Sequence, residues 1–329
     1  MSSLREIKDR IGSVRSTLKI TNAMKLVSSA KLRKAQQAIE ALRPYEATLS
    51  AILASVSVGR PGFDGGSPQK TPKMPATPDP DWGFPAESAK NAGNPAGGRV
   101  AVVAVASNSS LCGSFNGNVL RKTLEVLRDG TPLGGSASLA DVFPIGRRIA
   151  DPLRKAGFPA ARDLNDLAAH PSYEAASELA QSLTDTYAAG VYSKVILIYN
   201  HFVTASRQEV VCETYLPWND SPTKKAENVG DPGSEEGVAY ENGDFCGRYI
   251  VEPSPSSVTE TLLPQVMRLK IYAMLLDSAA AEHAARMIAM QTATDNAQDI
   301  LDELTLEYNK GRQQQITAEI LDIVGGSQQ

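Results

Sequence analysis

The sequence predicts an α/β protein in which a long helix at each end of the chain pairs with the other, beside a central α/β domain. Three observations predict it. Apolar residues recur with heptad spacing in residues 1–58 and 256–329, these two segments carry opposite net charge, and residues 99–255 alternate between strand and helix patterns. At about 150 residues per domain, a chain of 329 residues has room for about two such units.

Residues 1–58 read as one long helix. Pro44 is the only proline in this stretch, and the first apolar residues alternate spacings of three and four, which is the seam pattern of a coiled coil. These seam residues are Leu4, Ile7, Ile11, Val14 and Leu18. Ten Lys and Arg residues against three acids give residues 1–43 a net charge of +7.

Two segments look like insertions. Residues 59–98 contain eight prolines among Gly, Ser, Asp and Lys, which predicts an exposed and poorly ordered excursion. Residues 219–247 hold seven acids against two lysines and read as a hairpin extension or a disordered loop. Neither segment carries a motif that indicates a function.

The intervening residues, 99–255, are predicted to form a compact domain with a mixed sheet. Arg99 begins the buried strand RVAVVAVAS, and further strands are expected at 141–145, 194–200 and 208–216. Helices are expected at 118–128 and 173–189. This alternation is typical of an α/β domain.

The C-terminal segment, 256–329, is the most regular pattern in the chain. Up to Val324 it contains one proline, Pro264, and one glycine, Gly311, so a helix would begin at Pro264 or, with a kink there, near Ser256. Its net charge from residue 256 onward is −5. The unbroken heptad seam predicts a left-handed coiled coil and consists of Leu276, Ala280, His283, Met287, Met290, Thr294, Ala297, Leu301, Leu304 and Tyr308.

Two helices with seams and opposite charge are predicted to form an antiparallel two-helix coiled coil, with the α/β domain at the end where the chain leaves and returns. The C-terminal helix should outrun its partner by a turn or more. Its tip follows the polar stretch KGRQQQ and is apolar around much of its circumference, with Ile316, Ala318, Ile320, Leu321, Ile323 and Val324. Such a tip implies an external sleeve, a frayed end or a dimer contact.

Several classes of protein are disfavoured by the sequence. It has no apolar run of about 18 residues, so we expect no direct membrane insertion, and its charged N-terminus does not resemble a secretory signal. Three widely spaced cysteines, Cys112, Cys212 and Cys246, do not suit a disulfide framework or a CxxC metal site. We therefore expect a soluble protein of a reducing compartment, without metal or cofactor.

The sequence gives weaker support to an enzymatic or a nucleic-acid-binding function. GSFNGN at 113–118 is not GxGxxG, and no P-loop motif occurs, so a nucleotide site is weakly supported. Cys112 as a nucleophile lacks a nearby histidine, and His283 on the seam is better explained as a core residue than as a metal ligand. The +7 segment could bind nucleic acid, but the chain is acidic overall and its −5 segment can neutralise it.

Long stretches of the sequence resemble the gamma subunit of the F-type rotary ATP synthase. The resemblance is carried by IKDRIGSVRSTLKITNAMKLVSSAKLRKAQ with RPY at 43–45, by SAAAEHAARMIAMQTATDNAQDILDELTLEYNKGRQQQITAEILDIVGG from Ser278, and by LCGSFN at 111–116. It implies a coiled-coil shaft inside a ring of alpha and beta subunits and a Rossmann-like foot that contacts the epsilon subunit and the membrane c-ring.

The same resemblance implies a non-catalytic subunit that couples proton flow to ATP synthesis, or ATP hydrolysis to proton pumping, on the cytoplasmic face of the bacterial inner membrane. Met24 matches a turn that faces the beta subunits' acidic catch loop, and Arg286 matches a turn packed near it on the opposite helix. The expected rotor contacts are Met24, Lys25, Arg286, Lys310, Arg312, Gln313, Thr317 and Glu319. A coiled-coil adaptor for another partner remains the alternative.

Two features depart from the family pattern. Ser107, Asn108, Ser109 and Ser110 stand before LCG, where the family has a Ser-Asp-Arg-Gly type sequence, so an ion pair formed there in relatives is in doubt. The cysteine-pair loop of the chloroplast relatives is absent, because Cys212 and Cys246 are 34 residues apart in unrelated contexts. Redox control is therefore not expected.

Overall fold

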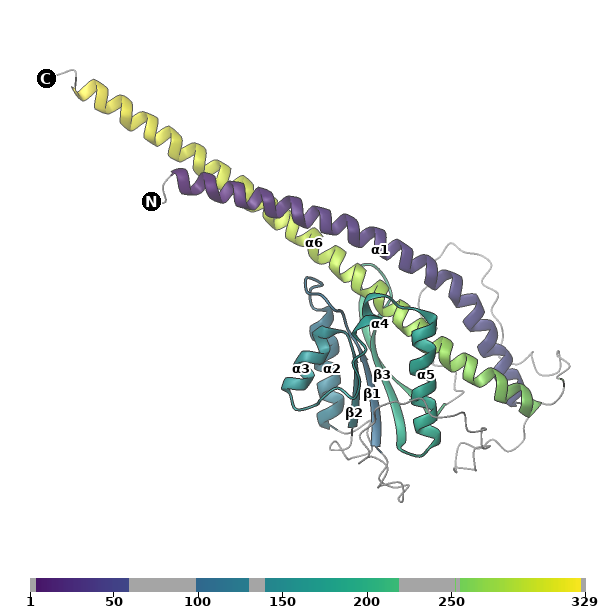
Figure 1. Ribbon diagram of the computed structural model, residues 1–329. Helices are drawn as coiled ribbons and strands as arrows, with labels where there is room; N and C mark the ends of the chain where they lie inside the picture. The colour runs from purple at the N-terminus through teal and green to yellow at the C-terminus, as the bar shows by residue number, and fades with distance from the viewer. Residues whose placement is uncertain (1–3, 59–98, 130–139, 219–251, 253–254, 327–329) are drawn as a thin grey trace.

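The computed structural model describes residues 4–58, 99–129, 140–218, 252 and 255–326. Both proposed insertions, 59–98 and 219–247, lie outside these residues, and so does Cys246. The described part consists of two long terminal helices and a central mixed sheet with shorter helices on both faces (Figure 1).

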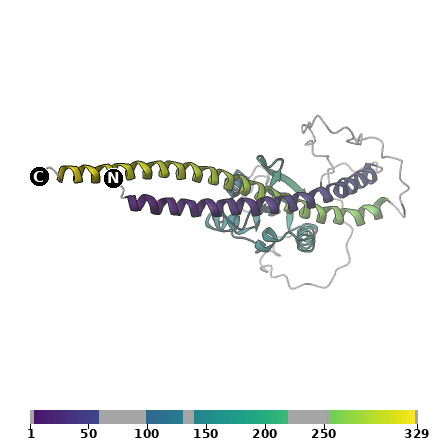
Figure 2. The same cartoon turned by 90° about the horizontal axis from the view of Figure 1, so that it is seen from above.

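The two terminal helices lie side by side in opposite directions. Helix α1 spans Leu4–Val58 and helix α6 spans Pro255–Gly326. Both views show the α/β domain beside the end of the pair where α1 finishes and α6 begins, while the other end projects away from it (Figures 1 and 2). The termini therefore lie at the end of the pair that is distant from the sheet.

The sheet has the strand order β2-β1-β3-β4. Strands β1 (Arg99–Val105), β2 (Ala140–Ile145) and β3 (Tyr192–Phe202) are parallel, and β4 (Gln208–Leu216) runs antiparallel to β3. In the register, Val102 pairs with Val142 on one side and with Ile196 on the other. Because β1 is central and buried on both faces, it reads as a continuous apolar run.

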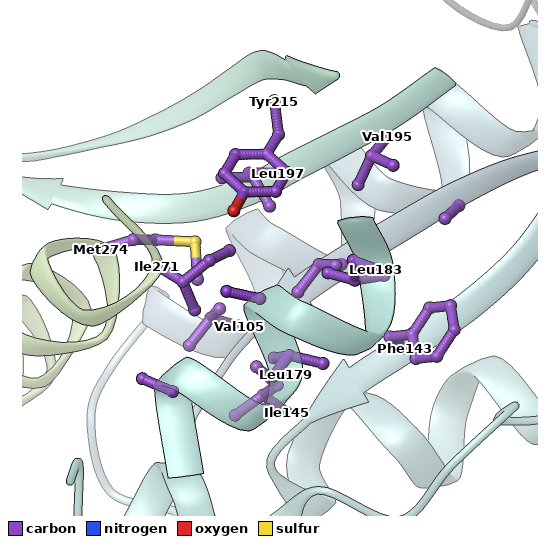
Figure 3. Packing of buried hydrophobic residues seen from close by; sticks show 14 of the residues in the cluster. Val105, Phe143, Ile145, Leu179, Leu183, Val195, Leu197, Tyr215, Ile271 and Met274 are labelled. Carbon is purple, nitrogen blue, oxygen red and sulfur yellow. The ribbon is translucent and has the colours of Figure 1, made fainter. Parts of the chain in front are cut away.

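Helices cover both faces of the sheet. Helices α2 (Phe115–Asp129) and α3 (Arg147–Lys155) cover one face. Helices α4 (Asn165–Ala169) and α5 (Tyr173–Ala188) cover the other face together with α6. Leu179 and Leu183 of α5 meet Ile271 and Met274 of α6 over the strands (Figure 3). The long helix α6 is thus a layer of the domain as well as one partner of the helix pair.

Helix α3 and helix α4 were not expected from the sequence. Helix α3 buries only Ile149 and Leu153, four residues apart, and a nine-residue helix with two apolar positions gives little periodic signal. It begins after Gly146, whose φ of 108° brings the backbone close to the Ala106 carbonyl, with an ideal Cβ only 2.3 Å from that oxygen. A side chain at this position would therefore clash with the end of β1.

The sequence left two starts open for this helix, and in the structure α6 begins at Pro255 and passes through Pro264. Pro264 has no backbone N–H to bond the carbonyl four residues before it. On the same stretch, Val266 and Leu269 are buried against Leu49 and Leu53 of α1. Burial of these side chains offsets the lost hydrogen bond and holds the first turns helical.

None of the helices that the structure describes combines the length and the apolar character needed to cross a membrane.

Ile271 contributes to the attachment of α6 to the sheet. Ile271 is fully buried, and Ile271→Ala should lower the free energy of unfolding by about 2–5 kcal/mol, because it leaves a cavity where α6, α5 and the sheet meet. Urea unfolding of the full chain measures this. Ile300→Ala is the matched control, since Ile300 is 46% exposed on the same helix, and an equal loss in both variants would contradict the assignment.

Candidate functional site

The helix pair carries the residues that the sequence singles out. Two polar contacts set its register. Lys25 Nζ donates to Gln291 Oε1 at 2.8 Å, and Thr294 Oγ1 donates to Thr21 Oγ1 at 2.9 Å. Thr21 is buried, and its hydroxyl also bonds the Leu18 carbonyl. Satisfied polar groups at a helix interface fix one alignment, because a shift would leave them without partners.

The residues of the expected seam are shielded from solvent to different degrees. Ile7, Met290, Ala297 and Leu304 are buried. The others are partly buried, namely Ile11, Val14, Leu18, Met287, Leu301 and Tyr308. Near the sheet, the buried Leu32 packs on Ala280 and Ala284 of α6. Small residues on α6 at this level allow α1 to lie close to it while the sheet contacts its other side.

His283 sits at this level of the pair. Its Nδ1 is buried without a hydrogen-bond partner, and burial together with the Arg286 and Lys31 cations lowers its pKa to about 4. It is therefore neutral near pH 7. In the part of the chain that is described, no group of three or more His, Cys, Asp or Glu side chains could hold a metal ion.

Most charges of the pair face outward. On α1 the side chains of Arg5, Lys8, Arg10, Arg15, Lys19, Arg33 and Lys34 are exposed. On α6 those of Asp295, Asp299, Asp302, Glu303 and Glu307 are exposed. The pair therefore presents one basic helix and one acidic helix to its surroundings, with long-range attraction between them screened by water and salt.

Arg286 is directed toward the α/β domain. Its Nη1 donates to Glu282 Oε1 at 2.7 Å and its Nη2 to Ser109 Oγ at 2.6 Å. The Arg286 and Glu282 side chains are only 11% and 12% exposed, and burial raises the pKa of Glu282 against the opposing effect of Arg286. On α1, Lys25 follows Met24 and hydrogen-bonds Gln291, five residues after Arg286 on α6, whereas Arg286 itself bonds Ser109.

The crevice at the carboxyl ends of β1 and β3 is filled by α6. In open α/β sheets, ligands bind where neighbouring connections leave the sheet in opposite directions, which here is between β1 and β3. Cys112 and Phe115 follow β1, are buried there, and pack on Ala281 and Ala285 of α6. The Cys112 Sγ accepts from Asn116 Nδ2 at 3.1 Å. Cys112 is thus a packed core residue beside α6.

At the end of the pair that is distant from the sheet, α6 extends beyond α1. Leu4 is the first described residue of α1, and its Cδ2 lies 3.0 Å from the position of a Cβ built on Gly311. Helix α6 then continues to Gly326, roughly 20 Å further at 1.5 Å per residue. In the described chain, residues 312–321 are all exposed. Among the residues that the structure describes, none forms a helix beside this end of α6.

This single-helix end carries both polar and apolar side chains. The polar ones are Arg312, Gln313, Thr317 and Glu319, preceded by the exposed Lys310. Ile316 is 45% exposed, and exposure rises along the tip to 72% at Ile323. Ile320 and Leu321 are exposed as well, whereas the side chain of Val324 lies outside the described part. Exposed apolar residues in such a row mark an interaction surface.

A second exposed apolar group was missed by the sequence reasoning. Ile20, Leu26 and Val27 on α1 are 57–62% exposed, and Ile288 on α6 is 41% exposed. The register places Val27 and Ile288 at nearly the same level of the pair. These apolar residues do not occupy heptad positions of the seam. An apolar residue outside the seam of a paired helix is expected to be exposed, and this pattern could have identified them from the sequence.

Comparison with known proteins gives consistent matches over the whole chain. A family profile described as ATP synthase matches residues 3–328. The chain is 42% identical to an ATP synthase gamma chain of Phocaeicola vulgatus over 327 residues, 99% of each chain. It is 37% identical to an ATP synthase gamma chain of Flavobacterium psychrophilum over 328 residues, 100% of this chain and 99% of the other.

Solved structures give the same architecture. A chain of the Euglena gracilis mitochondrial ATP synthase rotor matches 95% of this chain and 98% of its own length with a TM-score of 0.54 at 15% identity. A chain of the OSCP/F1/c-ring assembly from the same organism matches 98% and 92% with a TM-score of 0.55 at 15% identity. At this identity the likeness establishes the fold.

Arg286 provides a test of the link between α6 and the loop after β1. Arg286→Ala should destabilise the chain by about 3 kcal/mol, because it leaves the Glu282 carboxylate buried without its cation. The double variant with Glu282→Gln should recover part of this loss. Equilibrium unfolding of both variants measures it, and an unchanged stability in Arg286→Ala would show that the pair is solvated.

His283 gives a pH-dependent prediction with a definite sign. Its pKa is lowered in the folded chain, so the unfolded state binds more protons between pH 6.5 and about 4. Stability should therefore fall as the pH is lowered through this window. His283→Gln should reduce that fall, with the exposed His170→Gln as control, and the slopes are measured by urea unfolding at several pH values. Equal slopes in wild type and His283→Gln would contradict the assignment.

Proposed function

The chain belongs to the ATP synthase gamma-chain family, the central rotor shaft of the F-type enzyme, and we propose that its helix pair turns inside the ring of alpha and beta subunits. The observation that carries the proposal is the end of α6, which continues beyond Gly311 as a single helix with an exposed apolar tip. A helix of this kind is stabilised by a surrounding protein surface that covers its apolar side chains.

The shaft acts by its asymmetry. One helix is basic and the other acidic on their outward faces, and the shaft narrows from two helices to one. Each beta subunit therefore meets a different surface, and the surface stabilises the conformation that fits it best. Rotation presents these surfaces in turn, which couples proton flow through the membrane ring to ATP synthesis, or ATP hydrolysis to pumping.

The helix pair is the antiparallel coiled coil that the heptad pattern predicts. The seam positions of α6 keep alternating spacings of four and three from Leu276 to Tyr308, which favours a left-handed supercoil. The buried or partly buried state of these positions and the Thr21–Thr294 hydrogen bond support this geometry. A wound pair resists twisting better than two independent helices.

Rotor contacts are assigned to eight residues of the shaft, which are exposed or half-buried except for the mostly buried Arg286. They are Met24, Lys25, Arg286, Lys310, Arg312, Gln313, Thr317 and Glu319, and the tip within the sleeve comprises Ile316, Ile320, Ile323 and Val324. Polar contacts suit a moving interface, because each hydrogen bond contributes only about 1 kcal/mol net and can be exchanged for another. The Arg286 side chain is mostly buried, and its hydrogen bond to Ser109 also holds the shaft to the α/β domain.

The α/β domain is the foot of the shaft. It contacts the epsilon subunit and the membrane c-ring, which places the chain peripherally on the cytoplasmic face of the bacterial inner membrane. The chain is a non-catalytic subunit without cofactor, metal or nucleic acid. The filling of the β1/β3 crevice by Ala281 and Ala285 supports this assignment.

Deletion of residues 312–329 tests the role of the tip. Reconstituted with alpha and beta subunits of the same organism, the truncated chain should assemble poorly and give a several-fold lower ATPase activity, because the ring loses the apolar surface that centres the shaft. Arg154→Gln, on the exposed face of α3, is the control. Full assembly and activity of the truncated chain would refute a bearing role for the tip.

A further inference from the structure

Charged side chains from four elements meet where α1, the sheet and α6 come together. We call this group the polar joint. It comprises Arg43 and Glu46 of α1, Tyr199 and His201 of β3, Glu209 and Glu213 of β4, and Lys270 and Asp277 of α6. It lies apart from the Arg286 contact and from the tip, and neither the rotor contacts nor the seam uses it.

Asp277 is the centre of the polar joint. Its side chain is 13% exposed and forms an ion pair with His201 Nδ1. Its second oxygen, Oδ1, accepts from the Phe202 backbone N–H at 3.1 Å. The last two residues of β3 are thus fastened to α6 through one carboxylate, at the edge of the crevice that α6 fills.

The remaining groups extend the joint to β4 and α1. Lys270 Nζ lies 3.2 Å from Glu213 Oε2, and both side chains are mostly buried. The Tyr199 hydroxyl hydrogen-bonds Glu213. Glu46 of α1 is close enough to Lys270, Glu213 and Asp277 to interact with all three electrostatically. One network therefore spans both long helices and the sheet.

The charges of the polar joint do not balance. Four carboxylates, Glu46, Glu209, Glu213 and Asp277, face two cations, Arg43 and Lys270, and a third cation, Arg207, pairs with Glu209. A proton on His201 or Glu46 reduces the negative excess. Because the site is partly desolvated, repulsion among its carboxylates is stronger than on an open surface.

We propose that the polar joint is a pH-sensitive fastening in which proton binding by His201 tightens the attachment of β3 to α6, and proton release as the pH rises loosens it. The charged imidazolium adds an ion pair to a hydrogen bond that the neutral ring can still donate from Nδ1. The joint then changes stiffness without dissociating, because the apolar core around Ile271 keeps α6 on the sheet.

The direction of the effect follows from linkage. The hydrogen bond to Asp277 raises the pKa of His201, against a smaller opposing effect of burial. A raised histidine pKa contributes stability that is complete below the unfolded value and is lost as the pH rises through the folded value. Burial raises the pKa of Glu46, so its ionisation at higher pH acts in the same direction. His283 has the opposite sign, and a local measurement is needed to separate them.

The Phe202 amide provides that local measurement, because it donates to Asp277 itself. In the purified full chain, the protection factor for hydrogen exchange at Phe202 should fall several-fold between about pH 6 and about pH 8.5 in wild type. His201→Asn retains a side-chain donor but cannot titrate, and its protection should stay constant within about twofold over that range. Asp277→Asn should lower protection at every pH.

His170→Asn is the matched control, because His170 is exposed and outside the polar joint, and it should keep the wild-type slope. A wild-type protection factor that does not change with pH, or a slope that survives in His201→Asn, would overturn the proposal. If a variant fails to fold, NMR titration of the His201 ring in the unmodified chain decides it. A midpoint above about 6.5 supports the fastening, and one at or below that value refutes it.

The experiment uses the isolated full chain and is independent of the rotary role. Its failure would leave the proposed function untouched, and failure of reconstitution with the ring would leave the polar joint untouched.

Discussion

The structure depends on one stretch of α6, from Val266 to Ala284, which packs against α1 and the sheet at the same time. Its large residues, including Met267, Ile271 and Leu275, complete the core over the strands. Its alanines lie where the backbone of α6 comes close to its neighbours. Ala280 and Ala284 pack against Leu32 of α1, and Ala281 packs against Phe115. A helix buried on two sides cannot slide or turn relative to either neighbour without opening closely packed contacts.

From this anchored stretch, the chain becomes progressively less supported toward its C-terminus. Beside the sheet, α6 is enclosed by α1 and the domain. Farther out it is paired only with α1, through a seam that includes Met290, Ala297 and Leu304, and after Gly311 it is a single exposed helix. This gradient suits a shaft that is rigid at its foot and relies on a surrounding ring at its tip. The same constraint keeps Ala281 of α6 packed on Cys112 and Phe115, which follow β1.

The sequence predicted the parts of this architecture that have long periodic patterns. The heptads from Ile7 and Leu276 indicated both helices, and the apolar run after Arg99 indicated the central strand. Shorter features were not predicted, because they depend on tertiary contacts with residues that are distant in the sequence. Helix α3 has only two buried apolar residues, and the course of α6 through Pro264 depends on burial against Leu49 and Leu53. The partner of Arg286 also could not be read from spacing, because Ser109 is 177 residues away and approaches only when the loop after β1 folds.

The central claim, that this chain is a turning shaft, is tested most directly by watching it turn. A probe would be attached through a cysteine introduced at Arg154, on the outer face of α3, after assembly of the full chain with immobilised alpha and beta subunits. On addition of ATP, the account predicts stepwise rotation in one direction, with three dwell positions per turn, one for each beta subunit. A complex that assembles and hydrolyses ATP while the probe stays fixed would contradict it.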